Sequence, residues 1–177
     1  MNIYIIGYMG SGKTTVAKKL ASSFKYRFVD LDEEIIRETK NTIAELFEKH
    51  GEDSFRQEEQ KALHNTARLE NVVIATGGGA PCFFDNMDWM NEEGITVYLE
   101  ANAGLLFHRL VNEKDKRPLL KKISEIELME HIQEHLAQRE VFYSKALVTI
   151  RAASVNINQL KEKVKKAALK RAKKKSA

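Results

Sequence analysis

The segment GYMGSGKT, residues 7–14, has the spacing G-x-x-x-x-G-K-[ST] that holds phosphate groups. Glycines allow successive backbone N–H groups to point at phosphate oxygens, and the N-terminus of a following helix adds partial positive charge. Lys13 can reach the terminal phosphates, and the Thr14 hydroxyl can ligate Mg²⁺. The segment therefore predicts a nucleotide site.

Nucleotide binding by itself leaves the reaction open. The Asn-Lys-x-Asp segment expected of a guanine-reading GTPase does not occur in the sequence. The chain has 177 residues, which is short for a motor or a helicase core. A small-molecule kinase suits this length better, with its acceptor site and lid in the connections between core elements.

Two carboxylates, Asp30 and Asp32, follow a short apolar run. Open parallel sheets bind ligands at the carboxyl ends of their strands, so one carboxylate can serve a metal and the other an acceptor hydroxyl. Asp32 can also cap a helix that continues through residues 33–35. Capping and catalysis are compatible, and both interpretations stay open.

Arg56 and Glu59 stand three residues apart on one face of a predicted helix. Such pairs are usually exposed and contribute little to stability. Next to an acidic acceptor, the same Glu can instead hold a carboxylate-binding guanidinium in place. Arg139 and Tyr143 also share a helical face, and by themselves they could be ordinary helix residues without a functional role.

Three consecutive glycines, Gly77, Gly78 and Gly79, follow another apolar run. A glycine triplet can bring bare backbone N–H groups close to a ligand, whereas a simple turn rarely needs more than one or two. No Asp stands at this strand end to bind Mg²⁺. The second metal contact is therefore predicted at Asp30.

The segment 112–123 lies between two predicted helices and contains four lysines, Arg117 and Pro118. A basic, proline-interrupted connection suits a lid that closes over phosphates and excludes water. An ordinary solvated loop has the same composition, so both interpretations stay open.

These residues need a scaffold, and the apolar pattern predicts strands that alternate with helices. The strands are predicted at 2–6, 26–29, 72–75, 95–99 and 147–150; the helices at 13–24, 42 to near 51, about 53–69, 105–111, 124–142 and 157–168. Two capping boxes begin at Thr42 and Ser124. Uninterrupted apolar strands between helices indicate a parallel sheet covered on both faces, hence a three-layer α/β/α fold.

The whole chain, residues 1–177, is predicted to be one domain. Its parts are a core sheet in 1–30, 70–110 and 145–165, a substrate-binding region at about 31–65, a lid at about 112–123 and a basic tail at about 165–177. The apolar stripe ends near Lys165, which predicts a solvated, fraying helix end.

Composition excludes several classes of protein. One cysteine cannot form an intramolecular disulfide, and no apolar run approaches the roughly 20 residues that span a bilayer. The N-terminus lacks signal-peptide features, so the cytoplasm is expected. Residues 161–177 carry nine Lys or Arg and one Glu, a net charge of +8 against −4 for the rest. A nucleic-acid interpretation of the basic pI would depend on this tail alone.

Taken together, these segments resemble shikimate kinase. The matching stretches are GYMGSGKTT (7–15), FVDLDEEI (28–35), FRQEE (55–59), TGGGA (76–80), KRPLL (116–120) and REVFY (139–143). The resemblance implies a P-loop, nucleoside-monophosphate-kinase-like fold with a five-stranded parallel sheet, a shikimate-binding helical region and a lid. It also implies transfer of the ATP γ-phosphate to the 3-hydroxyl of shikimate, a step of aromatic amino-acid biosynthesis through chorismate.

The resemblance implies a role for each matching residue. ATP would contact Gly10, Ser11, Gly12, Lys13, Thr14, Thr15, Arg109 and Arg117; shikimate would contact Asp32, Arg56, Gly77, Gly78, Gly79 and Arg139; Mg²⁺ would lie near Thr14 and Asp30. Lys13, Asp32 and Arg117 would be catalytic. The expected partners are ATP and shikimate, without nucleic acid or membrane, and the expected state is a monomer.

Some features depart from this pattern or compete with it. Tyr8 stands where Phe is more usual, and segment 151–154 matches poorly and receives no role. Residues 131–135 formally match the zinc motif H-x-x-E-H, but their polar surroundings favour a solvated helix face. The rival functions are another small-metabolite kinase, such as a gluconate or nucleotide kinase, and a nucleic-acid-binding protein that uses the tail.

Overall fold

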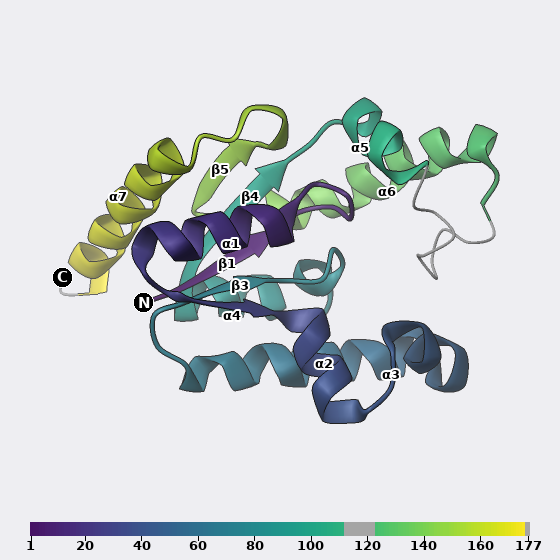
Figure 1. The fold of residues 1–177 in the computed structure, drawn as a ribbon, viewed down its shortest axis with the longest axis horizontal. Coiled ribbons are helices and arrows are strands. Elements are labelled where there is room, and N and C mark those ends of the chain that lie inside the picture. The colour runs from purple at the N-terminus through teal and green to yellow at the C-terminus, as the bar shows by residue number, and fades with distance from the viewer. Residues whose placement is uncertain (112–122, 176–177) are drawn as a thin grey trace.

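The computed structural model describes residues 1–111 and 123–175. The sheet that these residues form has five parallel strands in the order β2-β3-β1-β4-β5 (Figure 1). The strands are β1 (Asn2–Ile6), β2 (Arg27–Asp30), β3 (Val72–Ala75), β4 (Gly94–Glu100) and β5 (Val148–Arg151). The predicted five-stranded parallel sheet is confirmed, with each strand boundary within one residue of its prediction.

The central strand β1 is buried at every position. Ile3 aligns with Val73 of β3 on one side and with Ile95 of β4 on the other. Because helices cover both faces, a central strand needs apolar side chains on both faces. This explains why its sequence has no polar alternation.

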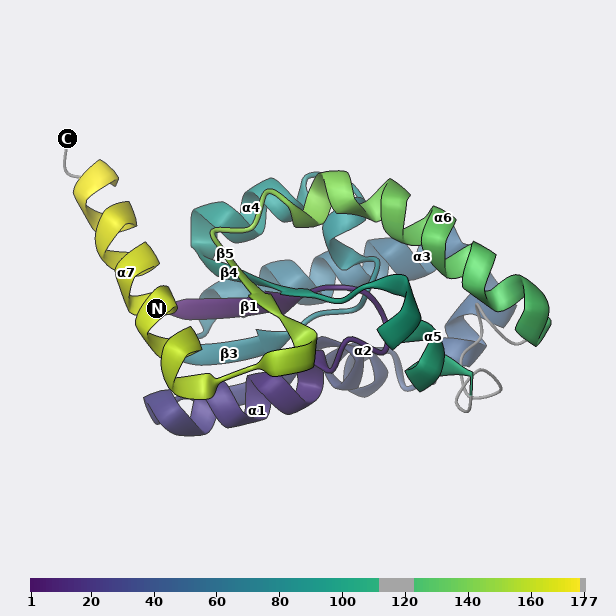
Figure 2. The same ribbon diagram turned by 90° about the horizontal axis from the view of Figure 1, so that it is seen from above.

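Seven α-helices surround the sheet in the described part of the chain. They are α1 (Lys13–Phe24), α2 (Leu31–Thr39), α3 (Ile43–Asn65), α4 (Asn86–Glu93), α5 (Ala103–Leu110), α6 (Glu125–Tyr143) and α7 (Ile157–Lys175). On one face, Leu20 of α1 and Leu160 of α7 join Ile5 in a buried cluster. On the other, Leu63 of α3 and Leu128 of α6 join a second cluster. Figure 2 shows α1 below the sheet and α4 and α6 above it, so the predicted three layers are confirmed.

The helix α2 starts directly after β2, and its cap differs from the prediction. The Asp30 carboxylate accepts a hydrogen bond from the Asp32 backbone N–H at 3.2 Å, which makes Asp30 the N-cap. Of the two interpretations of Asp32 that the sequence left open, helix capping is therefore excluded. Because Asp30 takes that role, the Asp32 carboxylate lies in the first helical turn.

The long helix α3 covers both helices predicted before residue 66. Gly51 interrupts it with φ +78°, a left-handed conformation that favours glycine. The Thr42 capping box that starts the helix is present as predicted, and so is the one at Ser124. Gly51 therefore separates the capped first part of α3 from the part that carries Arg56.

The basic tail continues as helix α7 to Lys175, and most of its residues after 165 are exposed, as a solvated helix end requires. Lys161 donates a hydrogen bond to the Ser23 carbonyl, and Arg171 donates one to the Gly94 carbonyl. Lys161 therefore binds α7 to α1 within the apolar stripe, and Arg171 binds it to β4 after the stripe has ended.

The parallel topology brings the predicted site segments to one edge of the sheet. Residues 7–12 follow β1, Asp30 ends β2, and residues 76–79 follow β3. In Figure 1, α2 and α3 lie on one side of the β1–α1 connection and α5 and α6 on the other. None of the described helices is both long enough and apolar enough to cross a membrane.

Candidate active site

The β1–α1 connection forms a tight loop whose shape depends on glycine. Gly10 has φ +78° and Gly12 has φ +100°, so both adopt conformations that residues with a Cβ rarely take. Gly12 is also the N-cap of α1, and Ser11 N donates to Tyr8 O at 3.1 Å to close the turn. The loop therefore leads directly into the positive end of the helix dipole.

Lys13 and Thr14 begin α1 at the mouth of this loop. The ammonium group of Lys13 donates to Gly7 O at 2.9 Å and to Tyr8 O at 3.0 Å, so it lies back over the loop. The Thr14 hydroxyl donates to the Asp30 carboxylate at 3.1 Å. The predicted pair of metal ligands is thus in direct contact.

A cleft of about 660 Å³ opens at this edge of the sheet. It is lined by residues 9–16 and 19, Asp30, Asp32, residues 76–78, Arg109, Ala152, Val155 and Ile157. All of the ATP and metal residues predicted from the sequence that fall within the described chain therefore share one cleft. Gly79, Arg56 and Arg139 are not among its described lining residues. Arg56 packs against Gly79 of the 77–79 turn, and Arg139 lies close to Gly78.

The cleft is lined by one predicted arginine and by residues that the sequence did not identify. Arg109, which the family resemblance assigned to ATP, donates to Gly10 O at 3.0 Å and to Ser11 O at 2.8 Å, so its side chain lies against the phosphate loop. Ala152, Val155 and Ile157, after β5, add an apolar surface. Their position after a strand at the same sheet edge was the available signal, but the segment matches no motif.

On the acceptor side, Arg56 is buried among carboxylates. Its NH1 donates to Glu59 at 2.7 Å, and its Nε and NH2 donate to Glu52 at 3.2 and 2.8 Å. Arg56 is 3% exposed and Glu59 is 0% exposed, so this is not the exposed pair that the spacing also allowed. Glu52 was missed, although its i, i+4 spacing to Arg56 was visible.

Burial raises the pKa of the Glu59 carboxyl to about 7, and the neighbouring Arg56 opposes that rise. One oxygen of Glu59 accepts from Arg56, while the other has no hydrogen-bond partner among the described residues. Burying a carboxylate oxygen without a hydrogen-bond partner costs free energy. This unpartnered oxygen, Oε1, packs against Gly77.

The glycine triplet leaves space for these charged side chains. A Cβ on Gly77 would lie 2.2 Å from Glu59 Oε1, and a Cβ on Gly79 would lie 2.6 Å from Arg56 NH2. A Cβ on Gly78 would lie 3.0 Å from the Met9 backbone nitrogen. The triplet therefore lets the ion pair and the phosphate loop approach one turn.

Replacing Gly77 with alanine should destabilise the fold by about 1–3 kcal/mol, because the new methyl group must displace Glu59 from a close-packed position. Urea unfolding followed by circular dichroism measures this change. Gly104→Ala is the matched control, since a Cβ there would meet only Asn102 at 3.7 Å, and it should stay within about 1 kcal/mol. Equal stability of the two variants would show that Glu59 moves away without cost.

The helix α6 brings a second guanidinium to the same turn. Arg139 is buried, and its NH1 would lie 3.6 Å from a Cβ on Gly78. That NH1 has no hydrogen-bond partner among the described residues. Tyr143, one turn further on, donates a hydrogen bond to Gly78 O and thereby binds α6 to the triplet. Arg139 and Tyr143 therefore belong to the candidate acceptor site around the glycine triplet.

Asp32 also approaches the glycine triplet. Its Oδ1 would lie 3.5 Å from a Cβ on Gly77, so Asp32, Arg56 and Arg139 approach the triplet from three different helices. Two guanidinium groups and one carboxylate at a single turn suit a ligand that has both a carboxylate and hydroxyl groups. The predicted lid at 112–123, with Arg117, falls outside the described residues except for Ile123.

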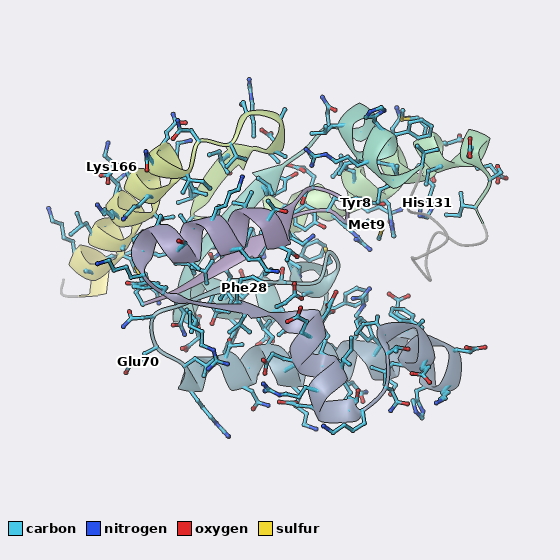
Figure 3. The ribbon with its side chains drawn as sticks, viewed as in Figure 1. Tyr8, Met9, Phe28, Glu70, His131 and Lys166 are labelled. Carbon is cyan, nitrogen blue, oxygen red and sulfur yellow. The ribbon has the colours of Figure 1, made fainter. Side chains whose placement is uncertain are left out.

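The histidines of the H-x-x-E-H match lie against the phosphate loop. Tyr8 OH is 3.3 Å from His135 Nδ1, and the rings of His131 and His135 are 4.9 Å apart. Figure 3 shows Tyr8 and His131 on the same side of the molecule. The described residues contain no group of three or more side chains that could hold a metal ion. His135 thus connects α6 to the phosphate loop, and both histidines are half-buried rather than on the solvated helix face that the sequence favoured.

Burial, together with the nearby positive charges of Arg139 and His131, lowers the pKa of His135 to about 4. A lowered pKa means that neutral His135 stabilises the fold above pH 6.5, and that this stabilisation is lost as the pH falls toward 4. Between pH 7 and 5, the unfolding free energy of the wild type should fall further than that of His135→Leu, by about 1 kcal/mol after solvent screening.

Urea unfolding at both pH values measures this difference, with the exposed His50 replaced by Gln as the matched control. The control should follow the wild type. If His135→Leu also follows the wild type, His135 does not resist protonation in the folded chain.

Comparison with protein-family models and with curated proteins identifies the family of this chain. The family model described as shikimate kinase matches residues 9–170. A shikimate kinase from Phocaeicola vulgatus is 50% identical over 144 residues, which are 81% of this chain and 82% of that protein.

Solved structures agree with this result. The shikimate kinase of Bacteroides thetaiotaomicron superposes with a TM-score of 0.82 at 42% identity, covering 94% of this chain and 95% of that one. The shikimate kinase of Acinetobacter baumannii, solved in complex with shikimate, gives 0.82 at 35% identity, covering 96% and 93%. The phosphate loop, the parallel sheet and these likenesses lead to one conclusion: the chain belongs to the shikimate kinase family, whose members are ATP-dependent kinases.

Proposed function

We propose that this cleft transfers the γ-phosphate of ATP to the 3-hydroxyl of shikimate. The observation that carries the proposal is the convergence of Asp32, Arg56 and Arg139 on residues 77–79, next to the phosphate loop. Shikimate has a carboxylate and three ring hydroxyls, and this set of side chains provides a complementary partner for both kinds of group. The family match and the shikimate complex of a 35% identical relative support the same assignment.

On the nucleotide side, the backbone of residues 10–15 and Lys13 would hold the phosphates of ATP. Arg109 lies against that loop and would flank the nucleotide, while Ala152, Val155 and Ile157 offer an apolar wall for the adenine ring. Arg117, outside the described residues, is proposed to approach the phosphates from the lid.

Thr14 and Asp30 would hold Mg²⁺, directly or through water. Their oxygens are 3.1 Å apart, and a hydroxyl with a carboxylate is the hard oxygen donor set that Mg²⁺ prefers. When bound, the ion would neutralise charge on the β- and γ-phosphates.

On the acceptor side, Arg56 and Arg139 would bind the carboxylate of shikimate, and the N–H groups of residues 77–79 would bind its hydroxyls. Asp32 would accept the proton of the attacking 3-hydroxyl. The new bond joins that oxygen to the γ-phosphorus as the bond to the β-phosphate oxygen breaks, and Lys13 stabilises the developing charge. Holding both reactants in line supplies most of the rate enhancement.

The proposal has the whole chain act as a single domain, with the substrate-binding region at 31–65 and the lid at 112–123. It also has the chain act as a cytoplasmic monomer without a nucleic-acid or membrane partner. The +8 charge of residues 161–177 does not enter the mechanism.

The test is ADP release from ATP and Mg²⁺ with shikimate, gluconate, a nucleoside monophosphate or no acceptor. We expect turnover with shikimate and at most about 1% of that rate with the others, because a site built to hydrogen-bond one substrate's polar groups strongly rejects acceptors that do not present them in the same positions. Turnover with gluconate or the nucleotide at a comparable rate would overturn the proposed acceptor. Salt-sensitive binding of DNA or RNA that disappears without residues 165–177 would support the rival that uses the tail.

A further inference from the structure

The guanidinium of Arg56 contacts an aromatic ring as well as two carboxylates. Its central carbon, Cζ, lies 4.2 Å from the ring centroid of Phe83, closer than to Phe55 at 5.1 Å or Phe47 at 5.9 Å. Glu52 and Glu59 accept hydrogen bonds from the edges of the same group. Carboxylates thus bind the guanidinium at its edges, while its central carbon lies over the Phe83 ring.

Phe83 comes from a different part of the chain than the other two rings. Phe47 and Phe55 are on α3 with Arg56, whereas Phe83 ends the short 3₁₀ turn Ala80–Cys82 after the glycine triplet. Because Phe83 and Arg56 belong to separate elements, their contact fixes the distance between α3 and the triplet.

The turn that carries Phe83 is itself well anchored. Cys82 N donates to Gly79 O at 2.8 Å, and the fully buried Asn86 side chain donates to Ala80 O at 2.9 Å. Asn86 N also donates to Phe83 O at 3.3 Å. The backbone on either side of the ring is therefore fixed, and the ring cannot easily move away from Arg56.

We propose that Phe83 is a positioning residue for recognition of the acceptor's carboxylate: its ring fixes the plane of the Arg56 guanidinium. The inference rests on the proposed function of Arg56. Two-point binding of a carboxylate requires both N–H donors to lie in the plane of the acid, and a tilt of 10–20° weakens it. Hydrogen bonds to Glu52 and Glu59 limit motion within the plane, whereas Phe83 limits tilting out of it.

The neighbouring residue provides a matched control. Phe84 has the same side chain but is 56% exposed, and no ring or cation contact to it occurs among the described residues. A comparison of Phe83→Leu with Phe84→Leu therefore separates the stacking contact from a general loss of aromatic surface in this segment.

The experiment measures KM for shikimate, KM for ATP and kcat, by ADP release. Phe83→Leu should raise KM for shikimate about 3–20-fold, the range expected from the loss of a desolvated cation–π contact. KM for ATP should stay within about twofold, because Phe83 does not line the cleft that contains the phosphate loop. Phe83→Tyr keeps the ring and should restore KM for shikimate, while Phe84→Leu should leave all three constants unchanged.

A second variant separates this inference from the proposed function. Lysine has no planar group to hold, so in an Arg56→Lys background Phe83→Leu should add less than about twofold to KM for shikimate. If Arg56→Lys by itself leaves KM for shikimate unchanged, the proposed role of Arg56 is wrong. If Arg56→Lys raises it but Phe83→Leu does not, or if Phe83→Leu raises both KM values equally, only the positioning role of Phe83 is overturned.

Thermal unfolding of each variant accompanies the kinetics. Should Phe83→Leu lower the melting temperature strongly, Phe83→Met replaces it as a bulkier ring-free variant. A change in KM for shikimate that follows the melting temperature across Leu, Met and Tyr variants, rather than the presence of the ring, also contradicts the inference.

Discussion

Replacing Lys13 by methionine should lower kcat by at least about a hundredfold, the effect expected when one fixed cation is lost from a charged transition state. The Lys13 ammonium lies over the phosphate loop, where it donates to the carbonyls of Gly7 and Tyr8. From this position a short movement of its flexible stem would bring it to the terminal phosphates. Methionine has a similar length without the charge, so the variant should fold normally. Steady-state ADP release with saturating shikimate measures the loss.

Lys18→Met is the control for that variant. Lys18 lies on the same helix, is exposed, and has its ammonium over the Phe28 ring, 5.1 Å from the centroid. Its replacement should leave kcat within about twofold, because it does not line the cleft. Retention of wild-type kcat by Lys13→Met would remove the phosphate loop from the mechanism.

Arg56→Ala should raise KM for shikimate by about a hundredfold while KM for ATP changes less than about threefold. Truncating one partner of a buried, charge-assisted pair costs about 2–5 kcal/mol, and here the lost partner would be the substrate's carboxylate. The nucleotide site is lined by other residues, so ATP binding should persist. Separate titrations of shikimate and ATP in the ADP-release assay measure the two constants.

Loss of Arg56 also affects the fold, because Glu59 would remain buried without its partner. The double variant Arg56→Ala/Glu59→Gln removes that charge and should recover most of the lost stability, but not shikimate binding. The matched control is Arg37→Ala, which removes an exposed arginine of α2 and should change neither constant. Equal increases in KM for ATP and shikimate would refute the role of Arg56 in carboxylate binding.

The nucleotide half of the site could be predicted from the sequence because its residues are close together along the chain. A strand, a glycine-rich loop and a helix start lie within residues 2–24, and the motif fixes which atoms face a phosphate. The contact between Thr14 and Asp30 needed one further step, the rule that parallel strands end at the same sheet edge.

The acceptor half of the site was harder to predict, because the roles of its residues depend on whether they are buried, and spacing along the sequence does not show burial. The i, i+3 spacing of Arg56 and Glu59 is the same for an exposed pair and for a buried one. Only the tertiary fold places the glycine triplet over them, and a Cβ on Gly77 would collide with Glu59. The sequence therefore gave two interpretations of this pair, and the packing of three separate elements decides between them.

The remaining differences have similar causes. The cap of α2 is at Asp30 rather than Asp32 because both can accept from a nearby backbone N–H, and the end of β2 decides which one does. The tail is helical to Lys175, and its Arg171 donates to the Gly94 carbonyl on β4, a long-range contact without a local signal. Phe83 was missed as a neighbour of Arg56 for the same reason. Glu52 was missed although its i, i+4 spacing to Arg56 was visible in the sequence.

The account depends on a site that binds an acid through two guanidinium groups, and one comparison of acceptors tests this most directly. The measurement is kcat/KM for shikimate and for its neutral carboxamide, which keeps the ring and every hydroxyl. The account predicts a loss of about a hundredfold or more for the carboxamide with the wild type, and a much smaller difference with Arg56→Ala. Equal use of both acceptors by the wild type would contradict it.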